Sequence, residues 1–101
     1  MAETGLRPTL CFNASFPLEA HFSATAGELA TRLAQSAGLA EREAREIGRS
    51  VDAAFTSVLS GRAANGATAV DISLCARPET FDASVAFGTT SVLAMTRPRS
   101  L

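Results

Sequence analysis

The 101-residue sequence has no lysine, no tryptophan and no tyrosine, and His21 is its single histidine. Without lysine, Schiff-base chemistry and Walker-type phosphate contacts are excluded. His21 has no Ser, Cys or Asp motif around it, so a solvent-exposed, non-catalytic position is expected. The net charge of −1 gives no reason to expect nucleic acid as a partner. No apolar run approaches the roughly 18 residues of a membrane span, so no membrane association is expected.

Cysteine is also scarce, and Cys11 and Cys75 lie far apart in the sequence. There is no C-x-x-C motif and no Cys/His cluster, so no metal site is predicted. Each cysteine lies in an alternating apolar stretch, which favours two small buried side chains in a reduced protein. A disulfide or redox pair is the alternative. The first ten residues lack a charged leader followed by an apolar stretch, so a cytoplasmic location is predicted.

The hydrophobic share of 47% and the charged share of 19% are typical of a globular chain, and its length predicts a single domain over residues 1–101. Apolar residues alternate from Pro8 to Phe16, which predicts a half-buried strand. Pro17 should interrupt that strand. The stretch Leu18–Phe22 alternates again and is interpreted as a second short strand.

Two helices follow in the sequence pattern. Thr25 and Glu28 have the spacing of a capping box, which predicts the start of the first helix, and Gly38 is a natural stop. The second helix should run from Ala40 to Gly61. Gly48 inside it either weakens the helix by about 1 kcal/mol or allows close packing against a neighbour. The apolar stripe of this helix has three-and-four spacing and comprises Ala44, Ile47, Val51, Ala54, Phe55 and Val58.

The remainder of the chain predicts three strands joined by short turns. A turn at 62–67 leads into a strand over Thr68–Ala76. A second strand spans Phe81–Phe87, with Phe81, Ala83, Val85 and Phe87 facing inward. A final strand at Ser91–Met95 precedes an RPRSL tail. We therefore expect an α+β fold: a two-layer sandwich of a mostly antiparallel, four- to five-stranded sheet with two main helices on one face.

The element order and the second helix resemble the GHKL (histidine-kinase-like) ATPase domain of anti-sigma serine kinases of the RsbW type. The motif helix of that family carries Glu, Ala, two residues, Asn, and a His four positions further on. Laid without gaps over SVDAAFTSVLSG, the Glu falls on Ala53, the Asn on Ser57 and the His on Gly61. The apolar spacing matches at Val51, Phe55, Val58 and Leu59, and Thr56 also fits.

The family has a second motif, an Asp-x-Gly at the end of a sheet strand, and then a flexible ATP lid. The best counterpart is the stretch Val85–Gly88, in which Phe87 occupies the acid position. The chain then passes almost directly from Gly88 into the last strand, so the lid is interpreted as deleted. The resemblance covers residues 8 to 97 in outline.

The resemblance implies a degenerate member of the family that has lost nucleotide binding. Ser57 is a poor substitute for the Asn amide oxygen at magnesium, and Ala53 offers no base for a water. Catalytic, cofactor-binding and metal-binding residues are therefore all assigned as none. The implied function is a non-enzymatic, bacterial transcription-regulatory domain. It would bind a protein partner, such as a sigma factor or an antagonist, and homodimerise through the first strand or first helix.

Two alternatives stay open at this level. The first is an active serine kinase or ATPase in which Asp52, roughly 100° around the helix from position 53, supplies the missing carboxylate. The second is a small-ligand-binding or structural domain of unrelated α+β fold. In that case the phenylalanines could line a pocket, although a core position is the simpler interpretation for them. These residues are Phe12, Phe16, Phe22, Phe55, Phe81 and Phe87.

Overall fold

The computed structural model describes residues 9–60 and 69–99 of the chain. The elements in chain order are β1 (Leu10–Pro17), α1 (Phe22–Ser36), α2 (Glu41–Ser60), β2 (Ala69–Ala76), β3 (Thr80–Phe87) and β4 (Thr90–Pro98). The predicted tail at 1–6, the predicted turn at 62–67 and the predicted end of the second helix at Gly61 lie outside the described residues.

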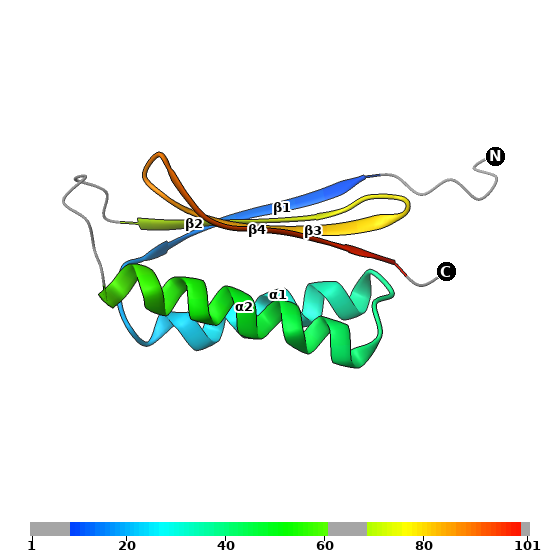
Figure 1. Ribbon diagram of the computed structural model, residues 1–101, viewed down its shortest axis with the longest axis horizontal. Coiled ribbons are helices and arrows are strands. Elements are labelled where there is room, and N and C mark those ends of the chain that lie inside the picture. The colour runs from blue at the N-terminus through cyan, green and yellow to red at the C-terminus, as the bar shows by residue number, and fades with distance from the viewer. Residues whose placement is uncertain (1–8, 61–68, 100–101) are drawn as a thin grey trace.

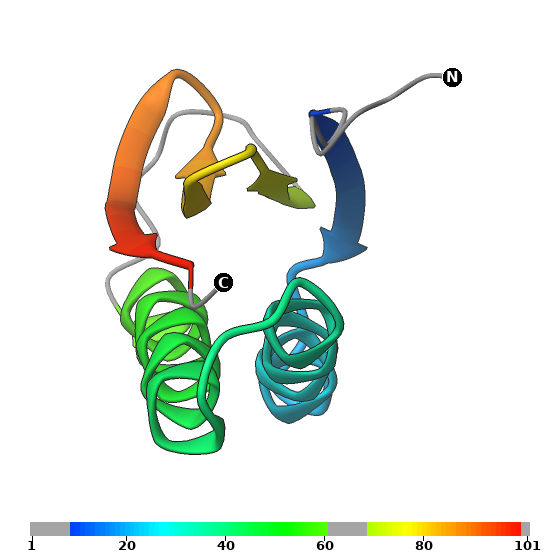
Figure 2. The ribbon, with the colours of Figure 1, turned by 90° about the vertical axis from the view of Figure 1, so that its right-hand side faces the viewer.

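The four strands form one antiparallel sheet in the order β1-β2-β3-β4. Both helices lie on one face of it (Figure 1). In the end view the sheet arches over the pair, with α1 below the β1 side and α2 below the β4 side (Figure 2). This arrangement confirms the predicted α+β, two-layer fold class.

The core lies between the sheet and the two helices, and it uses the predicted faces. All six stripe residues of α2 are buried, and Phe55 is completely so. The four residues of β3 that were predicted to face inward are all buried: Phe81 is 2% exposed and Phe87 is 4% exposed, and Ala83 and Val85 are at most 2% exposed. Val70, Ile72 and Leu74 supply the β2 contribution. The period-two and period-3.6 patterns therefore identified the buried faces of these elements.

The predicted short strand over Leu18–Phe22 and the predicted helix start at Thr25 are both wrong. The chain turns directly after Pro17, whose carbonyl accepts a hydrogen bond from Glu19 N at 2.8 Å. Helix α1 then begins at Phe22, whose ring packs against Phe16 at a centroid distance of 6.0 Å. This aromatic contact anchors the first turn of α1, which begins three residues before Thr25, where the capping pattern places the helix start. At the other end Gly38 has a φ of 98°, so the predicted stop is confirmed.

The last strand is longer than predicted, and part of the expected tail is ordered. Strand β4 extends to Pro98, and the backbone N–H of Arg99 donates to the carbonyl of Glu79 at 2.9 Å. The Arg99 side chain donates through Nε to Ala37 O at 2.7 Å and also to Arg77 O. The sequence did not predict this role of Arg99, because hydrogen bonds from one arginine to two backbone carbonyls leave no periodic pattern.

The expectation of two separate reduced cysteines is also wrong. Cys11 and Cys75 are directly opposite each other in the β1–β2 register and form a disulfide, with a Cα–Cα distance of 4.0 Å. Cys75 is 9% exposed, whereas Cys11 is on the solvent-exposed part of β1. A separation of 64 residues hid this contact, because only the pairing of the first and fourth elements of the chain brings the two residues together.

Candidate functional site

The positions that the family motif assigns to α2 carry no reactive group at the surface. Ala53 and Ser57 are both exposed and lie one turn apart on α2. Asp52 is half-buried and lies on the side of α2 that faces α1, because a Cβ added at Gly27 would be 3.1 Å from the Asp52 Cβ. Its carboxylate accepts a long hydrogen bond of 3.4 Å from Thr56. Asp52 therefore does not share a face with Ala53 and Ser57.

At the end of β3, Phe87, which the resemblance matches to the family's acid, is part of the core. Phe87 is 4% exposed, and it pairs with Val70 of β2 and Thr90 of β4. Gly88 follows with a φ of 65° and forms, with Thr89, the two-residue connection between β3 and β4. A positive φ at the first turn residue is what a tight hairpin of this kind requires. The strands are thus joined without any longer segment.

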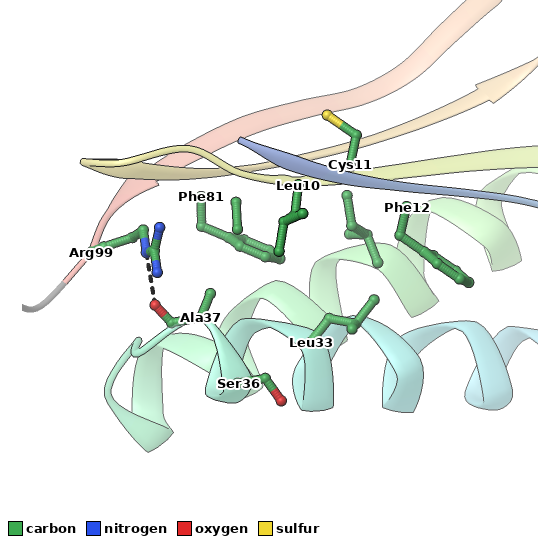
Figure 3. Close-up of a pocket in the computed structure, with 10 residues that line it drawn as sticks. Leu10, Cys11, Phe12, Leu33, Ser36, Ala37, Phe81 and Arg99 are labelled. Carbon is green, nitrogen blue, oxygen red and sulfur yellow. Dashed lines mark hydrogen bonds between the residues drawn. The ribbon is translucent and has the colours of Figure 1, made fainter. Parts of the chain in front are cut away.

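An apolar hollow lies between β1 and the carboxyl-terminal half of α1, with a volume of about 320 Å³. Figure 3 shows Leu10, Phe12 and Phe81 pointing from the sheet towards α1, from which Leu33 faces them. Below the sheet, Leu74 and Ala76 of β2 close the inner wall. Apolar side chains dominate the lining, as is common in binding sites for apolar ligands or partner side chains.

One charged side chain marks the end of this hollow. Arg99 lines it, and its Nε–H points to Ala37 O at the end of α1 (Figure 3). The two carbonyl contacts, to Ala37 and Arg77, fix the guanidinium where β4 and α1 finish. Among the residues that line the hollow, Arg99 is the single ionisable group that can offer charge.

The rim of the hollow is unusually apolar for a surface. Leu10 is 66% exposed and Phe12 is 43% exposed, and these are the exposed large hydrophobic side chains within residues 9–60 and 69–99. Both belong to β1, which pairs with β2 on one side and lies at the edge of the sheet on the other. We call the set Leu10, Phe12, Leu33 and Arg99, together with the free edge of β1, the β1 rim.

The sheet face away from the helices is polar and built from small side chains. Ser15 donates a hydrogen bond to Asp71 across β1 and β2. Asp82 accepts from Arg77 Nε at 2.5 Å and from Thr96 at 2.9 Å. These polar groups are satisfied by one another, so this face offers no reactive cluster in the part of the chain that is described.

The described residues form neither a metal site nor a membrane-spanning helix. Neither 9–60 nor 69–99 contains a group of three or more His, Cys, Asp or Glu that could hold a metal ion. No helix in those ranges is long and apolar enough to cross a membrane. His21 is exposed as predicted, 3.6 Å from a Glu19 carboxylate oxygen and with its ring 4.2 Å from that of Phe22.

The alternation that predicts the first strand puts Leu10 and Phe12 on the same side of it, but it did not identify them as a site. The missing signal was the sheet order, since an edge position is what leaves an inward-facing side chain uncovered. Of the six phenylalanines considered as pocket-lining, Phe12 and Phe81 line the hollow. No protein family, no curated protein and no solved structure compared with this chain matches it.

Proposed function

We propose that this chain is a non-catalytic regulatory domain that acts by binding another protein. It would correspond to an anti-sigma-type scaffold that no longer holds a nucleotide. The observation that carries the binding role is the β1 rim, where large apolar side chains are exposed next to a free strand edge and an apolar hollow. Exposed apolar patches of this kind mark interaction sites more often than chance surface.

Several features support the loss of catalysis. The motif positions on α2 hold Ala53 and Ser57, neither of which can act as a base or a strong magnesium ligand. The Gly88–Thr89 hairpin leaves no room for a lid between β3 and β4. Asp52 gives the active-kinase alternative no support, because it faces α1 rather than the side on which Ser57 lies.

The partner that the proposal names is a sigma factor or an antagonist in a bacterial partner-switching pathway, and the location is the cytoplasm. Disulfides are uncommon in that compartment except as redox-sensing or transient bonds. Under this proposal the Cys11–Cys75 bond would therefore exchange with cellular thiols, and would not stay permanently oxidised. Because Cys11 lies between Leu10 and Phe12, the bond is part of the strand that carries the β1 rim.

Calorimetry and a direct binding assay test this function together. Titration of the protein with magnesium-ATP should produce no binding heat, and micromolar affinity would contradict the loss of nucleotide binding. Purified sigma factors from the same source should then be titrated with the unmodified protein and with Leu10→Lys. The proposal requires one that binds the unmodified protein and binds the Leu10→Lys variant at least tenfold more weakly.

A second candidate function is supported by the hollow itself. Its volume of about 320 Å³ and its apolar lining fit a small apolar ligand, which would make the chain a ligand-binding α+β domain. Leu33→Trp should fill the hollow. A fluorescent aliphatic probe that binds the unmodified protein but not Leu33→Trp would favour this candidate. Equal binding of the probe to both proteins would remove it.

A further inference from the structure

We infer that Cys11 is a site of thiol–disulfide exchange. A small thiolate attacks its sulfur from the free edge of the sheet, forms a mixed disulfide with Cys11 and releases Cys75 as the thiolate, and the first half of β1 (residues 10–13) then loosens. The site is on the face of β1 opposite to Leu10 and Phe12, so the thiol does not occupy the β1 rim. The exchange stands on the geometry of the sheet, and its role in controlling partner binding rests on the proposed function.

The sulfur of Cys11 is open to attack. Cys11 is exposed, and its sulfur points away from the helices, onto the outer face of the sheet (Figure 3). A thiolate attacks a disulfide in line, so the incoming sulfur approaches from the side opposite to the leaving sulfur. Because Cys75 lies on the β2 side of Cys11, the approach to Cys11 comes from the free edge of β1. Within residues 9–60 and 69–99 no strand pairs with that edge.

The approach to Cys75 is covered. Cys75 is 9% exposed and pairs with Asp82 of β3, so the two side chains are neighbours on the outer face. An in-line attack on the Cys75 sulfur would have to come from this β3 side. The Asp82 carboxylate is fixed there by hydrogen bonds from Arg77 Nε at 2.5 Å and from Thr96 Oγ1 at 2.9 Å. It blocks the approach and repels an anionic thiolate, so the exchange takes place at Cys11.

The exchange balances with one class of co-reactant, a small-molecule thiol. Its thiolate contributes the electron pair of the new bond to the Cys11 sulfur, the Cys11–Cys75 bond breaks, and the electron pair of that bond leaves on Cys75. A second thiolate then attacks the small molecule's sulfur and releases Cys11 as a thiolate. This completes a two-electron reduction, with a small-molecule disulfide as the oxidised product.

The two halves of β1 are held differently. In the second half, the Phe16 ring contacts those of Phe22 and Phe55 at centroid distances of 6.0 and 6.2 Å. In the first half all four residues are exposed, so the bond to Cys75 and the ladder with β2 are what hold it. Segments with few buried contacts open at low cost. Loss of the bond therefore loosens residues 10–13 and leaves Phe16 in place.

Loosening of the first half changes the β1 rim directly. Leu10 and Phe12 are the exposed large apolar side chains of the rim, and both belong to the half that is released. The hollow loses its β1 wall at the same time, because Leu10, Cys11 and Phe12 are the β1 residues that line it. A partner that recognises these side chains must then order them on binding, which weakens its affinity. The oxidised protein is thus the binding form, and thiols switch it off.

Mapping of the first exchange product tests which sulfur is attacked. The oxidised protein is exposed briefly to glutathione, and excess N-ethylmaleimide then caps any freed thiol before peptide mass spectrometry. We expect glutathione on Cys11 and maleimide on Cys75 in at least about tenfold excess over the reverse product. Equal amounts of the two products, an excess of the reverse product, or no exchange would each overturn the inference.

Removal of the carboxylate tests why Cys75 is protected. Asp82→Ala should open the β3 side and raise the share of glutathione on Cys75 at least about threefold. The matched control Asp71→Ala removes a carboxylate from the outer face of β2, opposite Ser15, and should leave the ratio unchanged. Circular dichroism identifies a variant that fails to fold, and the mapping on the unmodified protein needs no variant. An unchanged ratio in folded Asp82→Ala would overturn the inference.

Order in β1 is measured by NMR on the oxidised protein and on the double variant Cys11→Ser, Cys75→Ser. The backbone order parameter of Phe12 should fall from about 0.85 to below about 0.6 in the double variant, while that of Phe16 stays near about 0.85. A Phe12 order parameter that stays high, or a Phe16 order parameter that falls equally, would overturn the inference that the bond holds the first half alone.

Partner binding separates this inference from the proposed function. A sigma factor that binds through Leu10 should bind the double variant at least about tenfold more weakly. Equal binding to the oxidised protein and to the double variant overturns the control by thiols and leaves the proposed function in place. If no sigma factor binds, the proposed function fails, whereas exchange at Cys11 and the loosening of Phe12 stand as separate observations.

Discussion

Gly27 of α1 and Gly48 of α2 lie against each other where the two helices cross. A Cβ added at Gly27 would be 2.7 Å from Gly48 O, and one added at Gly48 would be 2.6 Å from Gly27 O. Real Cβ atoms do not approach backbone oxygens this closely. The absence of side chains on both residues therefore sets the separation of the helices.

We expect Gly48→Ala to lower the free energy of unfolding by about 1–3 kcal/mol. The new methyl group would also be 1.9 Å from the Thr31 Oγ1, so the helices must move apart. This cost exceeds the roughly 1 kcal/mol that alanine contributes inside a helix. Urea denaturation measures the difference, with Ser57→Ala on the exposed part of α2 as the control. An unchanged or higher stability would show that the helices are not in contact here.

Reduction of the Cys11–Cys75 disulfide should lower the free energy of unfolding by about 2–4 kcal/mol. The bond joins residues 64 apart in sequence, so its loss releases a long loop in the unfolded chain. Urea denaturation with and without a thiol reductant measures this effect. The double variant Cys11→Ser, Cys75→Ser should resemble the reduced protein and show no response to reductant. Equal stability of the oxidised and reduced proteins would contradict the disulfide.

Two phenylalanines should respond very differently to truncation. Phe55 is completely buried and packs edge-on to Phe16 at a centroid distance of 6.2 Å. Phe55→Ala is expected to cost about 3–5 kcal/mol, because it leaves a cavity in the core. Phe12→Ala should cost less than about 1 kcal/mol, since Phe12 is 43% exposed. Similar losses for both variants would contradict the placement of β1 at the sheet edge.

Arg99 should contribute to stability through its two carbonyl contacts. Arg99→Ala is expected to lower the free energy of unfolding by about 1–2 kcal/mol, because Ala37 O and Arg77 O lose a charged donor. Lysine cannot reproduce the planar fork that reaches both oxygens, so Arg99→Lys should recover little. Arg97→Ala is the control, since within residues 9–60 and 69–99 the Arg97 side chain donates to the neighbouring Thr96 O alone, at 3.1 Å. Equal effects at positions 97 and 99 would contradict this role.

The regular elements could be predicted from the sequence because their buried faces are periodic. The stripe of α2 and the alternation of β3 from Phe81 to Phe87 each point to one side, and short turns favour antiparallel neighbours. The start of α1 could not be predicted in the same way. It depends on the contact between Phe16 and Phe22, and a tertiary contact of this kind overrides a weak capping signal at Thr25.

The candidate site was harder to predict than the fold. Leu10 and Phe12 look like core residues in the sequence, and only the sheet order shows that nothing covers them. Arg99 follows a proline in what resembles a polar tail, and its role depends on the position of Ala37 at the end of a helix 62 residues earlier. Periodicity describes one element at a time, so it carries no information on contacts of this length.

The Gly88–Thr89 connection makes one part of the molecule adaptable. Phe87 and Thr90 are already neighbours in the β3–β4 ladder, so the ends of any longer connection would be held in place by the sheet. Lengthening a flexible loop from two to about sixteen residues adds only about 2 kcal/mol of closure entropy. Foreign segments, including a nucleotide-covering loop, can therefore be grafted at this tip without redesign of the scaffold.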